Sequence, residues 1–206
     1  MLVGVDFDNT IVCYDRLFHR LALEQGLIPA DLPAAKGPVR DHLRRTGRED
    51  AWTEMQGLVY GAHIAEAAPF PGVYDFFRRC RKRGVDVCVI SHKTRQPFAG
   101  PRYDLHRAAH EWLEWQGFYR EAETGLTPER VYFEVLLEGK LKRIGQVGCD
   151  YFIDDLPELL EEPGFPAGVE RILFDPGGNW PGSGFRRAAT WEEVEGLILS
   201  SEYRGC

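Results

Sequence analysis

Two carboxylates one residue apart, Asp6 and Asp8, directly follow the first apolar run of the chain, and the hydroxyl of Thr10 comes next. A short apolar run bounded by polar residues is typical of a strand buried on both faces of a parallel sheet. Ligands of open α/β sheets bind beyond the carboxyl ends of the strands, so we expect chemistry at Asp6 and Asp8. One carboxylate can attack phosphorus to form an aspartyl-phosphate, and its neighbour can transfer the proton.

Two later apolar runs also end in polar residues, residues 85–90 at Ser91 and residues 149–153 at Asp154 and Asp155. Parallel strands joined by right-handed crossovers present their carboxyl ends at one edge of the sheet, so these side chains are expected to converge. Crowded carboxylates repel one another unless a cation lies among them, and oxygen ligands favour Mg²⁺. A lysine is needed to offset charge; Lys140 is the preferred candidate and Lys142 the alternative.

The remaining pattern alternates helix and strand. Residues 14–67 contain no buried-strand run, and their apolar residues recur at helical spacing, which predicts a small helical insertion. Thr190 and Glu193 have the spacing of a capping box before the last helix. Further helices are predicted over residues 73–83, 103–115 and 140–147, and further strands over 85–90, 131–133, 149–153 and 169–174. This order predicts an α/β fold with a five-stranded parallel sheet.

Composition narrows the class of protein. The 206 residues are 44% hydrophobic, which suits one domain with an insertion, and the net charge of -7 argues against a general nucleic-acid binder. No apolar run is long enough to span a bilayer, so no membrane partner is expected. The five cysteines are odd in number and form no CxxC pair, a pattern that suits reduced thiols and a cytoplasmic location.

These elements in this order resemble the haloacid dehalogenase (HAD) superfamily of Mg²⁺-dependent phosphohydrolases. Its DxDxT motif matches residues 6–10, its second motif Ser91, its lysine Lys140, and its paired acids residues 154–155. The resemblance implies a three-layer, Rossmann-like core formed by residues 1–13 and 68–206, with a five-stranded parallel sheet. It also implies that residues 14–67 are a small helical cap of the C1 type, a lid that excludes water and contacts the leaving group.

The resemblance also implies a role for each residue. Asp6 would be the nucleophile and a metal ligand, and Asp8 the acid/base, which binds the metal through its backbone carbonyl. Lys140 would offset charge, while Asp154 and Asp155 would complete the Mg²⁺ site. An acid at position 8 favours the phosphatase branch over dehalogenases, which lack the second carboxylate. The candidate phosphate ligands are Asn9, Thr10, Ser91 and His92.

The expected function is hydrolysis of a small phosphorylated metabolite, through an aspartyl-phosphate and with Mg²⁺. The alternatives are a phosphotransferase or phosphomutase of the same superfamily and a non-catalytic module that binds a phosphorylated ligand. The sequence does not identify the substrate or the oligomeric state. Several side chains have two readings, pocket contact or an ordinary surface or packing role: His92, Lys93, Arg95, Trp52, Tyr60, His106, His110 and the cap arginines Arg40, Arg44, Arg45 and Arg48.

Overall fold

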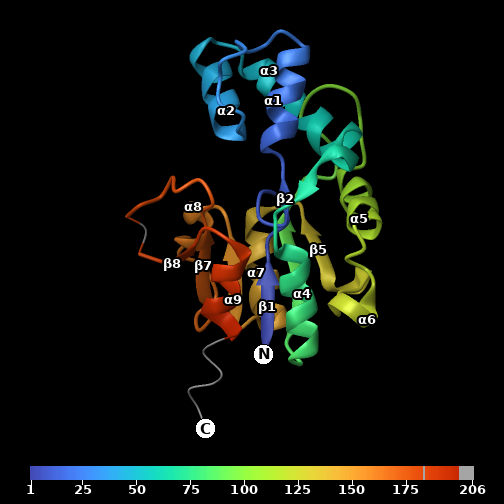
Figure 1. Ribbon diagram of the computed structural model, residues 1–206, viewed down its shortest axis with the longest axis vertical. Coiled ribbons are helices and arrows are strands. Elements are labelled where there is room, and N and C mark those ends of the chain that lie inside the picture. The colour runs from blue at the N-terminus through green and yellow to red at the C-terminus, as the bar shows by residue number, and fades with distance from the viewer. Residues whose placement is uncertain (183, 200–206) are drawn as a thin grey trace.

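The computed structural model describes residues 1–182 and 184–199, and its centre is a six-stranded parallel sheet (Figure 1). The strand order is β5-β4-β1-β6-β7-β8, so the N-terminal strand β1 lies in the interior of the sheet. Each neighbouring pair runs parallel. The strands are β1 (Leu2–Val5), β4 (Asp86–His92), β5 (Val131–Glu134), β6 (Tyr151–Asp154), β7 (Glu170–Phe174) and β8 (Arg186–Ala188).

The predicted parallel sheet is confirmed, but it has one strand more than the five expected. The additional strand, β8, lies between the predicted strand over residues 169–174 and the last helix, and it pairs with β7 alone. It is only three residues long, and its two arginines are exposed. An edge strand of this kind buries one residue, Ala188, and therefore leaves no run of apolar residues to reveal it.

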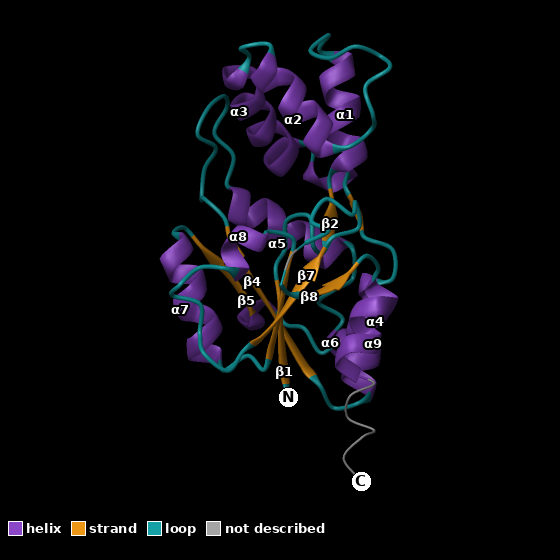
Figure 2. Cartoon of the chain, turned by 90° about the vertical axis from the view of Figure 1, so that its left-hand side faces the viewer, coloured by secondary structure: helices purple, strands orange, loops and turns teal. Residues whose placement is uncertain are grey.

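Helices cover both faces of the sheet and make the three layers that the sequence predicted. Figure 2 shows α7 (Leu137–Val147) on one side of the strands and α4 (Val73–Lys82), α6 (Glu121–Thr124) and α9 (Trp191–Leu199) on the other. The remaining core helices are α5 (Leu105–Trp115), the short α8 (Pro157–Leu160) and the 3₁₀ turn η3 (Pro128–Arg130).

Alternation along the strands divides the interior into two apolar clusters. Val3 and Val5 of β1 belong to the cluster that includes Phe77 of α4, whereas Phe152 of β6 belongs to the cluster that includes Ile144 of α7. Between Val3 and Val5, Gly4 faces the second cluster, and a Cβ there would lie 2.6 Å from Phe152 Cδ2 and 2.8 Å from Cys149 Sγ. The central strand therefore lacks a side chain at this point because the neighbouring ring occupies the space.

The insertion is helical, as its apolar spacing indicated. It contains α1 (Asp15–Glu24), α2 (Lys36–Arg45), α3 (Glu49–Gly57), a π-helical turn η1 (Leu58–Ala62) and a 3₁₀ turn η2 (Ile64–Glu66). Its three α-helices form a group at one end of the molecule, beyond β2 (Figure 1). An antiparallel pair, β2 (Val12–Cys13) and β3 (Ala68–Pro69), connects the insertion to the sheet.

Two element boundaries differ from the prediction in ways that affect the site. Strand β4 continues through His92 because its ladder with β5 pairs His92 with Glu134, so Ser91 lies within the strand. Helix α7 begins at Leu137, three residues earlier than expected, which places Lys140 in its first turn. Ser91 and Lys140 both remain at the sheet edge. Each now belongs to a regular element, so the strand or the helix fixes the position of its backbone.

The last helix is capped much as its sequence indicated. The backbone N–H of Glu193 donates to Thr190 Oγ1 at 3.2 Å, and Glu193 Oε2 accepts from the N–H of Ala189 at 2.7 Å. Among the described residues, none of the helices is both long and apolar enough to cross a membrane.

Candidate active site

A buried lysine joins two aspartates at the edge of the sheet. Lys140 Nζ lies 2.6 Å from Asp6 Oδ1 and 2.6 Å from Asp154 Oδ2. Asp6 follows β1, and its N–H donates to Ile153 O in the neighbouring strand, while Asp154 ends that strand, β6. Residues 148 positions apart in sequence thus meet because β1 and β6 are adjacent and parallel. The predicted convergence of Asp6, Lys140 and Asp154 is what the structure shows.

Burial and the neighbouring charges shift the pKa values of both Asp6 and Lys140. Burial raises the pKa of Asp6 to about 7, and the neighbouring Asp154 and Asp8 add to this rise while Lys140 opposes it. Burial alone would lower the pKa of Lys140, but Asp154 and Asp6 outweigh it, so the pKa of this ammonium is raised. Lys140 is therefore charged at neutral pH, and it is the positive charge that allows buried carboxylates to stay together.

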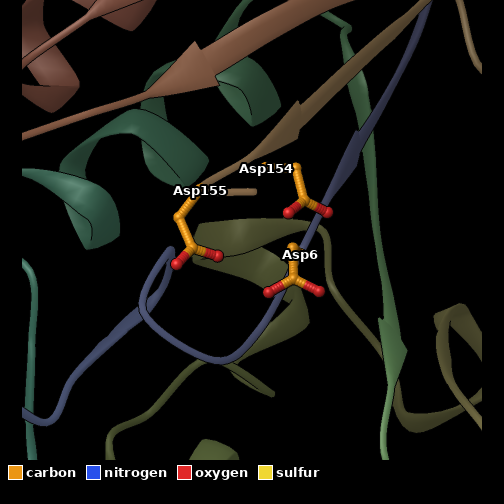
Figure 3. Close-up of side chains that lie close together, drawn as sticks. All are labelled: Asp6, Asp154 and Asp155. Atoms are coloured by element: carbon orange, nitrogen blue, oxygen red, sulfur yellow. The ribbon is translucent and has the colours of Figure 1, made fainter. Parts of the chain in front are cut away.

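Three carboxylates form an acidic cluster, which we define as Asp6, Asp154 and Asp155. One oxygen from each lies within 4.8 Å of the others, and their side chains gather where β1 and β6 end (Figure 3). Burial, with Asp154 and Asp6 beside it, raises the pKa of Asp155 well above its ordinary value. An all-oxygen donor set that repels itself fits a hard divalent cation, which would offset this repulsion. The acidic cluster could therefore hold such a cation.

The carboxylate of Asp8 lies apart from the acidic cluster and has its own partners. Its Oδ1 accepts from the hydroxyl of Tyr14 at 2.7 Å, and Lys93 Nζ lies 2.9 Å from Oδ1 and 2.8 Å from Oδ2. Lys93 is buried, whereas Asp8 is partly exposed. The two aspartates of the opening motif therefore stand in different surroundings, Asp6 against Lys140 and Asp8 against Lys93.

Lys93 is held by its backbone as well as by its side chain. Its N–H donates to Glu134 O at 2.8 Å, and its carbonyl oxygen lies 2.8 Å from His106 Nε2. Sequence patterns offered Lys93 only as one of three basic residues after the strand. The alternation of a strand was the available signal: residues 91 and 93 share one side of β4, and residue 92 faces the other.

The other predicted phosphate ligands are placed unequally. Ser91 is buried in β4, next to its last residue, and Asn9 adopts a left-handed backbone, φ 59°, in the turn after Asp8. Thr10 is also buried, and its hydroxyl has no hydrogen-bond partner in the part of the chain that is described. The structure does not bring His92 to the carboxylates: the residue is exposed, and its Nε2 lies 3.2 Å from Val135 O. The rival lysine, Lys142, is exposed on α7.

The cap supplies two groups near Asp8. The ring of Tyr60, in η1, lies 4.9 Å from Lys93 Nζ and 5.7 Å from Nζ of Lys36, the first residue of α2. Sequence patterns did not single out Lys36. Two cap arginines form surface ion pairs instead, Arg40 with Asp41 and Arg44 with Glu49.

Two aromatic or histidine candidates have packing roles. Trp52 is buried and stacks on Phe18 with ring centroids 4.9 Å apart. His110 contacts the hydroxyl of Tyr119, and its ring packs edge-on against Phe133 at 5.1 Å. His106 contacts the backbone of Lys93, as described above. The i, i+4 spacing of the two histidines therefore serves two separate contacts.

Comparison with known proteins identifies the fold. The sequence matches no protein-family model and no curated protein at a significant level. Solved structures do match. The chain is similar to a HAD family hydrolase from Deinococcus radiodurans with bound phosphate and sodium, at 17% identity and a TM-score of 0.60, over 98% of this chain and 96% of that one. It is also similar to protein tyrosine kinase A of Mycobacterium tuberculosis, at 16% identity and a TM-score of 0.61, over 95% of this chain and 96% of that one.

A third similar structure is the putative HAD-hydrolase YfnB from Bacillus subtilis, which was solved bound to magnesium. The identity is 16% and the TM-score 0.55, over 96% of this chain and 97% of that one. Proteins described as dehalogenases are also among the neighbours. The chain therefore has the fold of the HAD-superfamily hydrolases, and Asp6, Lys140 and Asp154 lie together at one edge of its sheet.

Proposed function

We propose that this protein is a Mg²⁺-dependent hydrolase of small phosphomonoesters. The observation that carries the proposal is the pair of differently supported aspartates at one strand end: Asp6, bound to Lys140 within the acidic cluster, and Asp8, bound to Lys93 and Tyr14. Nucleophilic attack and proton transfer require two carboxylates in unlike surroundings. A binding module that performs no chemistry would have no need for the second one.

In the proposed reaction, an oxygen of Asp6 attacks phosphorus, the bond from phosphorus to the ester oxygen breaks, and an aspartyl-phosphate forms. Asp8 gives its proton to the departing alkoxide, then takes a proton from the water that hydrolyses the intermediate and so regains its starting state. Lys140 and Ser91 offset and bind the charge of the phosphoryl group. Asp6, Asp154 and Asp155, with the backbone carbonyl of Asp8, would hold Mg²⁺, which would neutralise phosphate oxygens.

Phosphate ester cleavage is favoured over dehalogenation because of Asp8. Displacement of a halide needs no proton donor, whereas an alkoxide leaving group does. Asp8 lies two residues after Asp6, and its carboxylate is fixed by two hydrogen-bond donors. The similarity to a hydrolase that was solved with bound phosphate supports the same reading.

The proposed function is tested by measuring phosphate release from a panel of sugar phosphates, short alkyl phosphates and an aryl phosphate with Mg²⁺. We expect turnover that EDTA abolishes and Mg²⁺ restores, and no halide release from a short 2-haloacid. Halide release without phosphate release would show a dehalogenase. Phosphoryl transfer to an added sugar in preference to water would show a phosphotransferase, and binding of phosphorylated ligands without any turnover would show a binding module.

We also propose that residues 14–67 act as the cap of this site, on a core of residues 1–13 and 68–206. The support is their position beyond β2 and the reach of Tyr60 and Lys36 toward the partners of Asp8 (Figure 1). A glycine marks the close approach: a Cβ at Gly61 would lie 2.6 Å from Tyr103 Cγ. Packing of η1 against the segment before α5 would set where the cap rests.

Mg²⁺ is expected to raise the melting temperature, and to raise it more at pH 8 than at pH 5. In the folded protein the pKa of Asp6 is raised from 3.8 to about 7, so between these values the folded state binds the proton more tightly than the unfolded state. The stability that this carboxyl contributes is complete at low pH and is lost as the pH rises through 7. A cation that binds the ionised cluster replaces what is lost, by about 2.7 kcal/mol at one hundred times its Kd.

This prediction is checked by thermal denaturation with Mg²⁺ and with NaCl at equal ionic strength. Asp154→Asn serves as the matched variant, since it removes one ligand without adding bulk, and it should lose most of the shift. An equal effect of Mg²⁺ at both pH values would contradict the placement of the cation among these carboxylates.

Lys93→Met should lower kcat roughly tenfold to a hundredfold for an alkyl phosphate and much less for p-nitrophenyl phosphate. The substitution removes the ammonium that holds Asp8, so proton donation to a poor leaving group suffers, whereas nitrophenolate leaves without a proton. His92→Gln is the matched control because it changes the adjacent residue on the opposite side of β4. Equal losses on both substrates would show that Lys93 acts on the phosphoryl group and not through Asp8.

A further inference from the structure

Lys36 carries an ammonium that has no carboxylate partner. It is half-buried at the start of α2, and its backbone N–H donates to Asp15 Oδ1 at 2.8 Å, which fixes the start of that helix against α1. Its Nζ lies 5.7 Å from the ring centroids of both Phe18 and Tyr60. Among residues 1–182 and 184–199, the ion pairs found include none for Lys36. A cation withdrawn from water is costly unless an anion meets it.

The ammonium of Lys36 stands on the side of the cap that faces the catalytic carboxylates. Burial lowers the pKa of Lys36, but Tyr60 and the charges of Asp155 and Asp8 outweigh it, and the pKa is raised. Tyr60 connects the two parts of the site because its ring lies near Lys36 and near Lys93. Lys36 therefore belongs to the space between the cap and the sheet edge rather than to the outer surface.

Among the described residues at this edge, Lys36 and Asp155 are the lysine and the carboxylate that form no ion pair, and the charge of Asp155 acts on Lys36 from a longer distance. Lys140 is matched by Asp6 and Asp154, and Lys93 is matched by Asp8. A cation bound to the acidic cluster would reduce the negative charge that Lys36 now feels. A substrate whose only charge is the transferred phosphoryl group would leave the ammonium of Lys36 without a partner.

A small cavity lies beside Tyr60, between the cap and the core. A cavity of about 100 Å³ has Tyr60 in its wall, with Gln56 of α3 on the cap side and Thr94, the residue after Lys93, on the core side. Neither Lys36 nor any residue of the acidic cluster lines this cavity. A larger cavity, of about 360 Å³, lies elsewhere, between α8 and residues 179–182, and contains none of the candidate catalytic residues.

We propose that Lys36 binds a second anionic group of the substrate, so that the protein acts on small phosphomonoesters that carry a carboxylate or a further phosphoryl group close to the ester oxygen. This inference rests on the proposed function, and it names the substrate class of that same site. The phosphoryl group to be transferred lies at Asp6, and the second anion lies on the leaving group, under the cap. Tyr60 forms the wall between Lys36 and Lys93 and positions the small connecting part.

The test compares esters of similar size that differ in charge: ethyl, carboxymethyl and 2-aminoethyl phosphate, with ethane-1,2-diol bisphosphate as the doubly phosphorylated form. Wild-type kcat/KM should be at least about tenfold higher for an anionic ester than for ethyl phosphate, and lowest for the aminoethyl ester. The better of the two anionic esters identifies the second group as carboxylate or phosphate. No preference for either would overturn the proposal.

Lys36→Met should reduce that preference to near one, chiefly through KM, while kcat/KM for ethyl phosphate changes less than about threefold. Lys36→Arg should restore most of it, because the charge is kept. Arg45→Met is the control, a cation removed from the exposed far end of the same helix, and should change nothing. Equal losses on all esters in Lys36→Met, or an unchanged preference, would assign Lys36 to packing.

Failure of the proposed function can be told apart from failure of this inference. If wild-type protein releases phosphate neither from any of these esters nor from an aryl phosphate, the hydrolase proposal is wrong. Calorimetric titration of the same esters into wild-type and Lys36→Met protein with Mg²⁺ then decides the role of Lys36 alone. The role of Lys36 is supported if wild-type protein binds carboxymethyl phosphate more tightly than ethyl phosphate and the Lys36→Met variant loses this difference. It is refuted if wild-type protein binds both esters equally or binds neither.

Discussion

Asp6→Asn is expected to reduce phosphate release by at least ~10³-fold while leaving the fold intact. The amide has nearly the shape of the carboxylate but cannot form the aspartyl-phosphate, and it weakens one ligand of the acidic cluster. The measurement is steady-state phosphate release from an aryl phosphate, with circular dichroism to verify the fold.

Asp31→Asn is a suitable control, since it makes the same chemical change at an exposed position in the cap. Trapping provides a second readout: wild-type protein that is acid-quenched during turnover should carry phosphate on Asp6, and the variant should carry none. Retention of wild-type turnover by Asp6→Asn would show that the nucleophile lies elsewhere.

Lys140→Met should have the second large effect, on stability as well as on activity. Its removal leaves Asp6 and Asp154 buried without their counter-charge, which typically costs about 3–5 kcal/mol. For a chain of this size, that corresponds to a fall of roughly 6–20 °C in the melting temperature. Activity should fall at least ~10²-fold, because the phosphoryl charge also loses its partner.

Lys142→Met is the matched control, the same substitution two residues further along α7 at an exposed position. Mg²⁺ should recover part of the lost stability in Lys140→Met, since the cation supplies positive charge to the same carboxylates. A melting temperature equal to that of wild-type protein, measured without Mg²⁺, would contradict the ion pairs of Lys140.

Much of the site could be predicted because its residues follow strand ends. Asp6 and Asp154 come directly after apolar runs, and the rule that parallel strands align their carboxyl ends brings them together without knowledge of any contact. Lys140 was selected as a lysine at the start of a helix, through the resemblance to the HAD superfamily. Its burial, against the exposure of Lys142, is what separates it from that alternative.

The remaining features depended on pairing and packing that one sequence does not encode locally. Strand β8 is defined by its partner β7, since three residues with two exposed arginines carry no strand signal of their own. His92 and Lys93 are adjacent and both basic; strand alternation places them on opposite sides, and the fold decides that the side of Lys93 is the one that faces Asp8. Lys36 is far from every motif, and the fold of the cap is what brings it to Tyr60.

The sequence by itself determined the order of five of the six strands of the sheet and the opening Asp6-Phe7-Asp8-Asn9-Thr10 segment, because burial and strand alternation are properties of neighbouring residues. The tertiary structure decided how the two aspartates differ. Asp6 meets Lys140 and Asp8 meets Lys93 and Tyr14 because segments from distant parts of the chain fold onto the same sheet edge. Which side chain pairs with which carboxylate is a matter of distance in space, and spacing in sequence does not determine that distance.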